Sequence, residues 1–334
     1  MVKTQIIAEV GVNHNGSINL AKKLIIEAKK AGADCVKFQT FNSDQMVTRW
    51  SPKANYQKKN NFKQGQYEML KKLELKKKDF LALKNFCKSK KIEFISSGFS
   101  LEDIEYLKKI RVKRFKIPSG EITNLFYLKK IGSYNQETIL STGMSSISEI
   151  SDAIKVLLRS GLNKKKLTLL HCISEYPTDL RKLNLKFIPK LKKKFGINIG
   201  FSDHSKSLIA PVVAVSLGAT IIEKHFTLNC NMRGPDHSSS LNPKEFIKMV
   251  EFIRDTEISL GQQKKIISQK EISNKKIVRK SIVAKKRIIK GQLFTLENLE
   301  FKRPGYGISP MKIKKILGKK SKKNFKKEDL IKFI

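Results

Sequence analysis

The chain has 334 residues, with 69 Lys and Arg against 29 Asp and Glu, so its formal net charge at pH 7 is +40. Its apolar content of 40% is too high for a disordered polycation, which excludes that class and predicts a folded protein with a substantial core. The length excludes a miniprotein that depends on disulfides, and it suits either two ordinary domains or one α/β barrel of roughly 250 residues with a small appendage.

The positive charge has two interpretations, a polyanion-binding surface or a solvated coat of lysines. A nucleic-acid-binding protein usually concentrates its basic residues in one segment. Here the lysine runs recur along the whole chain, at 22–23, 58–59, 71–78, 164–166, 192–194 and 319–327. This distribution favours the solvated coat, and we expect no nucleic-acid partner.

The cysteines give no sign of a disulfide framework or a structural zinc site. Cys35, Cys87, Cys172 and Cys230 show neither a C-x-x-C pair nor zinc-finger spacing. The N-terminus has no apolar signal segment, and no uncharged apolar run approaches the roughly 18 to 20 residues of a membrane-spanning helix. We therefore expect a cytoplasmic protein without a membrane partner.

In chain order, the first 260 residues repeat one pattern: a β-branched run that ends in polar residues, a helical stretch, and then Gly or a basic turn. Eight such runs are expected strands, at 5–13, 35–41, 93–99, 114–120, 137–143, 167–174, 198–205 and 221–227. Eight βα units predict a closed (β/α)8 TIM barrel rather than an open doubly wound sheet, and no G-x-G-x-x-G motif is present.

The pattern also predicts the domain boundaries. We expect the barrel domain over 1–262, a charged connector over 263–280, and a small C-terminal domain with a thin core over 281–334. Within the barrel, the long connections 42–64 and 228–243 are expected to be loops at the rim of an active site.

Active sites of such barrels lie at the C-terminal ends of the strands, and the histidines of this chain concentrate there. All five occur at or just after an expected strand end: His14, His171, His204, His225 and His237. This placement is the strongest internal indication of catalysis, although a single strand-end histidine often serves only as a hydrogen-bonded scaffold.

Two of the histidines are candidate metal ligands. His204 and His225 end neighbouring strands, which run roughly 5 Å apart, so both imidazoles can reach one ion. A divalent ion held there would act as a Lewis acid on a carbonyl.

Two lysines lie within otherwise apolar strands, where a cation needs an anionic partner. With hydroxyl groups from Ser97, Ser119 and Ser141, the side chains of Lys37 and Lys116 would form a cradle for phosphate and carboxylate. The alternative is an internal ion pair, and the two are compatible. Three carboxylates are candidate partners and general bases, with none preferred: Glu9, Glu121 and Glu223.

The ordered motifs resemble those of the bacterial sialic acid synthase family, which includes N-acetylneuraminate and N,N'-diacetyllegionaminate synthases. The motifs are IIAEVGVNHNGS, CVKFQTF, FKIPSGEITNL, ILSTGM, LLHCISEYPT, GFSDHS, IEKHFT, GPDHSSSLNP and KRPGYGISP. The resemblance implies a (β/α)8 barrel followed by an antifreeze-like (SAF) domain. It also implies a domain-swapped homodimer, in which the small domain caps the partner's barrel.

The resemblance further implies a reaction: condensation of phosphoenolpyruvate with an N-acetylated amino sugar and water, giving a nine-carbon 2-keto acid and phosphate. The sugar is N-acetylmannosamine or, alternatively, 2,4-diacetamido-2,4,6-trideoxymannose, because members acting on either share most of the motifs. The remaining alternatives are a phosphoenolpyruvate-dependent synthase acting on a sugar phosphate and a basic nucleic-acid-binding protein.

Roles for single residues follow from the same resemblance. Phosphoenolpyruvate would be held by Lys37, Ser97, Lys116, Ser119, Ser141 and Ser174. His204 and His225 would bind Mn²⁺ or Mg²⁺, and Glu9 and Glu223 would transfer protons. Contacts to the sugar would come from Tyr176, Asp236 and, across the dimer, Arg303.

Overall fold

The computed structural model describes residues 3–53, 65–262 and 264–332. The chain divides into two units, Met1–Gly261 and Gln262–Ile334, and the division falls one residue before the expected end of the barrel domain. Of the long connection 42–64, residues 54–64 lie outside the described part of the chain. No helix in the described ranges has the length and apolar character that a membrane span requires.

The first unit is a closed barrel of eight parallel strands in sequential order, as the sequence predicted. The strands are β1 (Gln5–Gly11), β2 (Cys35–Thr40), β3 (Glu93–Gly98), β4 (Phe115–Ile117), β5 (Thr138–Ser141), β6 (Leu167–Cys172), β7 (Asn198–Asp203) and β8 (Ile221–His225). β1 pairs with both β2 and β8, which closes the barrel.

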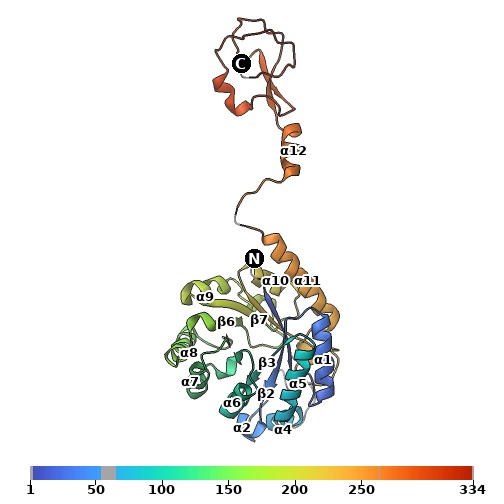
Figure 1. Cartoon of the computed structure of the whole chain (residues 1–334), viewed down its shortest axis with the longest axis vertical. Coiled ribbons are helices and arrows are strands. Elements are labelled where there is room, and N and C mark those ends of the chain that lie inside the picture. Colours follow the sequence, from blue (N-terminus) through green and yellow to red (C-terminus); the bar gives the residue numbers. More distant parts are fainter. Residues whose placement is uncertain (1–2, 54–64, 263, 333–334) are drawn as a thin grey trace. The chain divides into compact units, whose positions relative to one another are not determined.

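Helices surround the strands of this unit (Figure 1). They are α1 (Ile18–Lys30), α2 (Ser43–Met46), α4 (Gln66–Leu73), α5 (Lys77–Ser89), α6 (Leu101–Lys109), α7 (Leu125–Ser133), α8 (Ile147–Arg159), α9 (Phe187–Phe195), α10 (Ile209–Ser216) and α11 (Pro243–Leu260). Short polar side chains begin many of them. Ser146, for example, accepts the N–H of Glu149, whose carboxylate accepts the N–H of Ser146, and this capping box starts α8.

Alternation along the strands gives the barrel two separate cores. A large outer core fills the space between strands and helices, and includes Phe38, Phe115 and Phe201. A smaller inner core fills the barrel with Ile7, Cys35, Ile95, Ile139, Leu170 and Ile221. Because residues two apart share a face, the side chains that follow the inner core along each strand point into the barrel mouth.

All eight barrel strands end earlier than the sequence pattern predicted. β4 ends at Ile117 and β6 at Cys172, so the predicted site residues Ser119 and Ser174 lie in the loops that follow. The polar residues after the strands kept the strand-like sequence pattern, but the chain leaves the sheet there, and Ser119 already belongs to a short 3-10 helix, η1 (Ser119–Glu121).

The second unit has a small core of its own. β9 (Ser281–Ala284) and β10 (Leu299–Lys302) pair antiparallel, and Ile282, Ile288 and Phe325 are among the buried residues. The expected connector contains a helix, α12 (Gln269–Val278), which starts with a capping box between Ser268 and Glu271 and has no buried residue. Its charged sequence concealed the helix because no apolar face is repeated along it.

Candidate functional site

A cavity of about 720 Å³ lies at the C-terminal ends of the barrel strands. Residues from all eight strands, or from the loops directly after them, line it together with α2 and α4. The lining includes most of the predicted site residues: Glu9, Lys37, Ser97, Lys116, Ser119, Ser141, Ser174, Tyr176, His204, Glu223, His225 and Asp236. The fold therefore brings these separated motifs to one place.

Two lysines and two glutamates alternate in the buried part of this cavity. Lys37 Nζ lies 2.7 Å from Glu9 Oε2 and 3.9 Å from Glu223 Oε1, and Lys116 Nζ lies 3.5 Å from the same Glu223 oxygen. Each side chain is at most 6% exposed. Opposite charges that alternate in this way offset the cost of burying each one. The lysines thus have internal ion-pair partners and also line the cavity, so the ion pairs leave the predicted role in substrate binding open to test.

The network separates the two carboxyl groups by their pKa values. Burial raises the pKa of Glu9 to about 7, although the charge of Lys37 acts to lower it. Burial also acts to raise the pKa of Glu223, but Lys116 and Lys37 together hold that pKa below its ordinary value. Glu223 therefore remains ionised, whereas Glu9 exchanges its proton near neutral pH.

Hydroxyl groups and one glycine form a cradle beside the lysines. Lys116 Nζ donates to Ser141 Oγ at 2.8 Å, and the Gly143 N–H donates to Ser119 Oγ at 3.0 Å. A Cβ at Gly143 would collide with the hydroxyl groups of Ser119 and Ser174, so only glycine leaves this space open. Such a concave group of donors and cations fits phosphate and carboxylate.

Two further polar atoms of the cavity are suited to a ligand. The Ser97 hydroxyl and Glu223 Oε2 are buried, and neither has a hydrogen-bond partner among the described residues. Buried polar atoms in folded proteins are normally hydrogen-bonded, and a bound substrate or solvent satisfies such groups.

The two predicted metal ligands lie side by side, with ring centroids 5.5 Å apart. His204 Nδ1 lies 2.6 Å from the carbonyl oxygen of Ile173, so Nδ1 carries a proton and donates it there. Burial acts to lower the pKa of His204, but Cys172 and the Ile173 carbonyl raise it. For His225, burial and the neighbouring His204 lower the pKa well below its ordinary value, which keeps this imidazole neutral.

This pair fits a divalent ion in part. His225 Nδ1 is buried with no hydrogen-bond partner among the described residues, and a neutral imidazole nitrogen of this kind is a good metal ligand. Within the same part of the chain, no group of three His, Cys, Asp or Glu side chains forms a complete site. Two protein nitrogens are therefore available, and the other ligands would come from substrate or water.

Tyr176 and Asp236 lie on the same side of the cavity as the imidazoles. The Tyr176 ring packs over His204 at 4.1 Å between centroids, and it meets His225 edge to face at 5.6 Å. Burial raises the pKa of Asp236 to about 6, against the charges of His204 and Lys37. Its carboxylate faces the cavity, where it can accept hydrogen bonds from a ligand.

Two predicted site residues lie elsewhere. Glu121 does not line the cavity: it is the last residue of the short helix η1 (Ser119–Glu121), and its carboxylate accepts a hydrogen bond from Asn124. Arg303 is an exposed residue of the second unit, just after β10.

Some contributors to the site were not among the predicted residues. Gln39 donates to Glu9 Oε1 at 3.2 Å, and Ser202 donates to Glu223 Oε1 at 3.0 Å. Cys172 lies 3.8 Å from His204 Nδ1. Strand alternation was the signal that could have found Gln39 and Ser202. Each is two residues from a predicted site residue, Lys37 on β2 or His204 just after β7, and residues two apart share a face.

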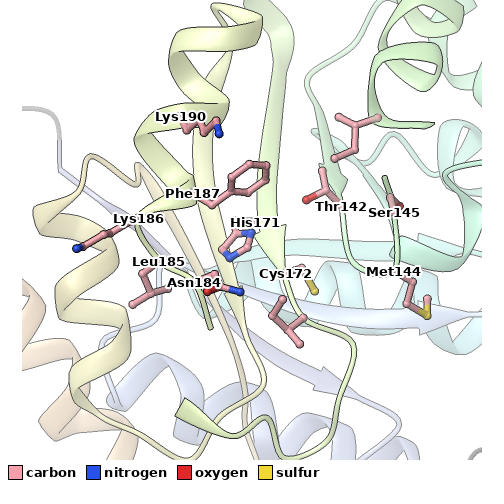
Figure 2. Close-up of a pocket in the computed structure, with 12 residues that line it drawn as sticks. Thr142, Met144, Ser145, His171, Cys172, Asn184, Leu185, Lys186, Phe187 and Lys190 are labelled. Carbon is pink, nitrogen blue, oxygen red and sulfur yellow. The ribbon is translucent and has the colours of Figure 1, made fainter. Parts of the chain in front are cut away.

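A second cavity, of about 830 Å³, opens between the loops after β5 and β6 and the start of α9. Figure 2 shows His171 and Phe187 in it, with Thr142 and Met144 on the facing side. Met144 and Cys172 line both cavities. Among the described residues, none of those predicted to bind substrate or metal or to transfer protons lines the second cavity. The larger cavity is therefore not where the ion network and the paired imidazoles lie.

Comparison with known proteins agrees with this arrangement. Residues 24–265 match the NeuB family, and residues 279–333 match the SAF domain. The chain is 47% identical to an N,N'-diacetyllegionaminic acid synthase of Campylobacter jejuni, over 99% of both chains. It is 43% identical to the enzyme of the same name from Legionella pneumophila, over 96% of this chain and 90% of the other.

Among solved structures, the chain resembles a sialic acid synthetase from Leptospira borgpetersenii. The TM-score is 0.72 at 35% identity, and the match covers 81% of this chain and 90% of the other. Both the sequence motifs and the barrel that presents them are thus shared, and the chain belongs to the NeuB family, with a C-terminal SAF domain.

Proposed function

We propose that this protein condenses phosphoenolpyruvate with an N-acetylated amino sugar and water, producing a nine-carbon 2-keto sugar acid and phosphate. The observation that carries the proposal is the buried network of Lys37, Lys116, Glu9 and Glu223 beside a hydroxyl cradle and two imidazoles. The lysines and the hydroxyl cradle suit an anionic substrate, and the two imidazoles suit a metal ion that polarises a carbonyl group.

Phosphoenolpyruvate would occupy the cradle, with its phosphate and carboxylate near Lys37, Lys116 and the surrounding hydroxyls. Its C3 attacks the aldehyde carbon of the open-chain sugar, and water adds to the cationic C2. Phosphate then leaves, which makes the reaction irreversible. Because the lysines are fixed before substrate arrives, they stabilise shifting charge without reorganisation.

Proton transfer is assigned to Glu9. Its pKa of about 7 allows both protonation states at neutral pH, whereas the pKa of Glu223 is lowered by Lys116 and Lys37 against the effect of burial. A group that transfers protons works best when its pKa is near the operating pH. Glu223 would instead stay ionised and hold both lysine ammonium groups in place.

His204 and His225 would hold a divalent metal ion at the aldehyde end of the sugar. When bound, such an ion supplies Lewis-acid polarisation of the carbonyl. Two imidazole ligands favour Mn²⁺ over Mg²⁺, because Mg²⁺ strongly prefers oxygen ligands. Tyr176 packs against both rings and restricts their rotation, which keeps the two nitrogens oriented.

The sugar we favour is 2,4-diacetamido-2,4,6-trideoxymannose, because two relatives that match almost the whole chain at 47% and 43% identity are legionaminic acid synthases. N-acetylmannosamine is the second candidate, supported by the structural likeness to a sialic acid synthetase.

A sugar phosphate is a poorer candidate. Its phosphate would need its own cations, and in the described lining of the cavity the only lysine or arginine side chains are Lys37 and Lys116. Both are already paired with Glu9 and Glu223.

The dimer is also part of the proposal. The family resemblance implies that Arg303 of one chain would contact the sugar in the barrel of another, and the exposure of Arg303 in its own unit supports this. An exposed guanidinium is available to bind the hydroxyl and acetamido oxygens of a sugar.

The decisive test is turnover with identified products. Purified protein with Mn²⁺ and phosphoenolpyruvate is supplied with each of the two sugars, or with N-acetylmannosamine 6-phosphate. We expect phosphate release and a 2-keto acid of the corresponding mass with the unphosphorylated sugars, and a higher kcat/KM for the diacetamido sugar. Absence of phosphate release with all three sugars would contradict the proposal.

A further inference from the structure

His237 is a buried histidine that the proposed chemistry does not use. It directly follows Asp236 in the loop after β8, and its side chain is fully buried. Its two ring nitrogens are both hydrogen-bonded: Nδ1 lies 2.6 Å from Thr227 Oγ1, and Nε2 lies 3.2 Å from Asn15 Oδ1 in the loop after β1.

The network fixes the tautomer of His237. Asn15 Nδ2 donates to the carbonyl oxygen of Arg233 at 2.9 Å, so Asn15 Oδ1 is the acceptor that faces the ring. Nε2 of His237 must then carry the proton, and Nδ1 accepts from the Thr227 hydroxyl. Burial lowers the pKa of His237 to about 4, so this single-proton form persists at neutral pH. Only a neutral imidazole spans both partners as acceptor at one end and donor at the other.

A second set of hydrogen bonds holds the backbone of Asp236. Ser240 Oγ donates to the Asp236 carbonyl at 2.7 Å, and Asn13 Nδ2 donates to Ser240 Oγ and to the Phe226 carbonyl, each at 2.9 Å. Asn13 lies in the loop after β1, as Asn15 does. Asp236 is therefore linked to the loop after β1 in two ways, through its own carbonyl by Ser240 and Asn13 and through the neighbouring His237 by Asn15.

The space around the ring is filled. A Cβ added to Gly234 would lie 2.6 Å from His237 Cδ2 and 2.8 Å from Asn15 Oδ1, so any other residue would displace the ring. The backbone of the loop thus packs directly against the imidazole, and this packing restricts the ring to one orientation.

We propose that His237 is a positioning residue, which together with Asn15 and Thr227 fixes the loop after β8 so that the Asp236 carboxylate faces the sugar. We name the set Asn13, Asn15, Thr227, His237 and Ser240 the β1–β8 clasp. The inference rests on the proposed function, because Asp236 has a ligand only if a sugar occupies the cavity. It predicts that the clasp acts on sugar binding and leaves phosphoenolpyruvate binding unchanged.

The test compares steady-state KM values for both substrates in the full-length protein. His237→Ala should raise the sugar KM by about 10- to 100-fold, the usual effect of losing a residue that orients another, with the phosphoenolpyruvate KM changed less than about twofold. His237→Asn keeps an acceptor for Thr227, and His237→Gln keeps a donor for Asn15, so each should recover part of the loss. An unchanged sugar KM in His237→Ala would overturn the inference.

His171→Ala is the matched control. His171 is also a buried strand-end histidine, and its Nε2 lies 2.7 Å from the Leu183 carbonyl, but its ring faces α9. It should lower thermal stability without changing the sugar KM. An equal rise in sugar KM in the control would mean a general structural effect and would also overturn the inference.

A double-mutant cycle shows whether His237 acts through Asp236. In an Asp236→Asn background, His237→Ala should add no further increase in sugar KM, whereas an additive increase would contradict the assignment. If His237→Ala does not fold, Thr227→Val removes one hydrogen bond at nearly constant volume and takes its place in the cycle. The proposed function fails separately, if the wild-type protein turns over no sugar at all.

Discussion

Under the proposed function, single residues in the buried ion network would determine where the anionic substrate binds. Lys116 illustrates this: burial lowers its pKa, Glu223 acts to restore it, and its Nζ donates to Ser141. Its charge is thus held between a carboxylate and a hydroxyl cradle. Removing it would leave Glu223 buried with one cation fewer.

Lys116→Met should therefore lower kcat/KM for phosphoenolpyruvate by at least about 100-fold, because a fixed charge near the reacting phosphate is lost. Phosphate release at varied phosphoenolpyruvate measures the effect. Lys113→Met is the matched control: its side chain is 72% exposed just before the same strand, β4, and the variant should stay within about twofold of wild type. Near-normal kinetics in Lys116→Met would contradict the assignment.

Asp236 gives the site a dependence on pH. Burial raises the pKa of its carboxyl group to about 6, so it is ionised above that pH and protonated below it. Under the proposed function, the ionised form would accept hydrogen bonds from the sugar. We expect the sugar KM to rise as pH falls below about 6, and we expect Asp236→Asn to show a high, pH-independent KM. A pH profile of sugar KM at saturating phosphoenolpyruvate checks this.

The raised pKa of Asp236 also makes the stability of the protein depend on pH, and here low pH is favourable. The pKa is raised from 3.8 to about 6 in the folded protein, so the folded state binds this proton more tightly than the unfolded state. The stabilisation is complete below the unfolded value and is lost as pH rises through the folded value. Relative to Asp236→Asn, the wild-type protein should lose stability between about pH 4 and pH 6 in denaturant unfolding; a constant difference would contradict the shift.

At the scale of elements, the inner core of the barrel sets how closely the strands approach. Gly200 on β7 shows the constraint, because a Cβ there would lie 2.5 Å from Leu170 Cδ2 and 2.6 Å from the Ile221 carbonyl. β6, β7 and β8 therefore meet closely below the two imidazoles, and this contact aligns the strand ends that carry His204 and His225.

Gly200→Ala should destabilise the protein by about 1–3 kcal/mol through overpacking. For a domain of this size that corresponds to a fall in Tm of roughly 2–12 °C in a thermal melt. Gly120→Ala is the control, since a Cβ there meets nothing within 4 Å. An unchanged Tm in Gly200→Ala would show that the barrel relaxes to accept the methyl group.

At the scale of the whole molecule, the proposed role of Arg303 requires a residue of the second unit to act at a site in the barrel unit. If Arg303 acts on the partner's barrel, two inactive variants should complement each other in a mixed dimer. One variant lacks a working barrel site, and the other lacks Arg303. Mixing Arg303→Ala with Lys116→Met, after dissociation and reassociation, should restore up to about one quarter of wild-type activity, because half of the dimers then have one complete site.

Two controls define that experiment. Arg287→Ala changes another exposed arginine of the second unit and should have normal kinetics before mixing. Each variant reassociated with itself should stay inactive. No recovery in the mixed sample would place Arg303 on its own chain or outside the site.

The net charge of +40 also belongs to the whole molecule. Lys37 and Lys116 are paired with Glu9 and Glu223 in the buried network, so any long-range attraction of phosphoenolpyruvate comes mainly from the surface lysines. We expect kcat/KM for phosphoenolpyruvate to fall with added NaCl while kcat remains constant. The neutral sugar is the internal control, and its KM should not change; an identical salt dependence for both substrates would contradict steering.

The sequence by itself determined the barrel and most of the site's membership. Strand periodicity gave eight βα units, and the topology of such units requires polar residues at strand ends, from Glu9 to His225, to meet at one mouth. The motifs then identified the family. These properties follow from local pattern and connectivity, which a linear sequence records.

Only the tertiary structure decided which of those residues line the cavity and what protonation state each one has. It separated Glu9 from Glu223 by the positions of Lys37 and Lys116, left Glu121 outside the cavity, and added Gln39 and Ser202 to it. It also joined Asn15 to His237 across 222 positions of sequence. Charge separation, burial and hydrogen-bond direction depend on distances between strands, and no spacing along the chain contains them.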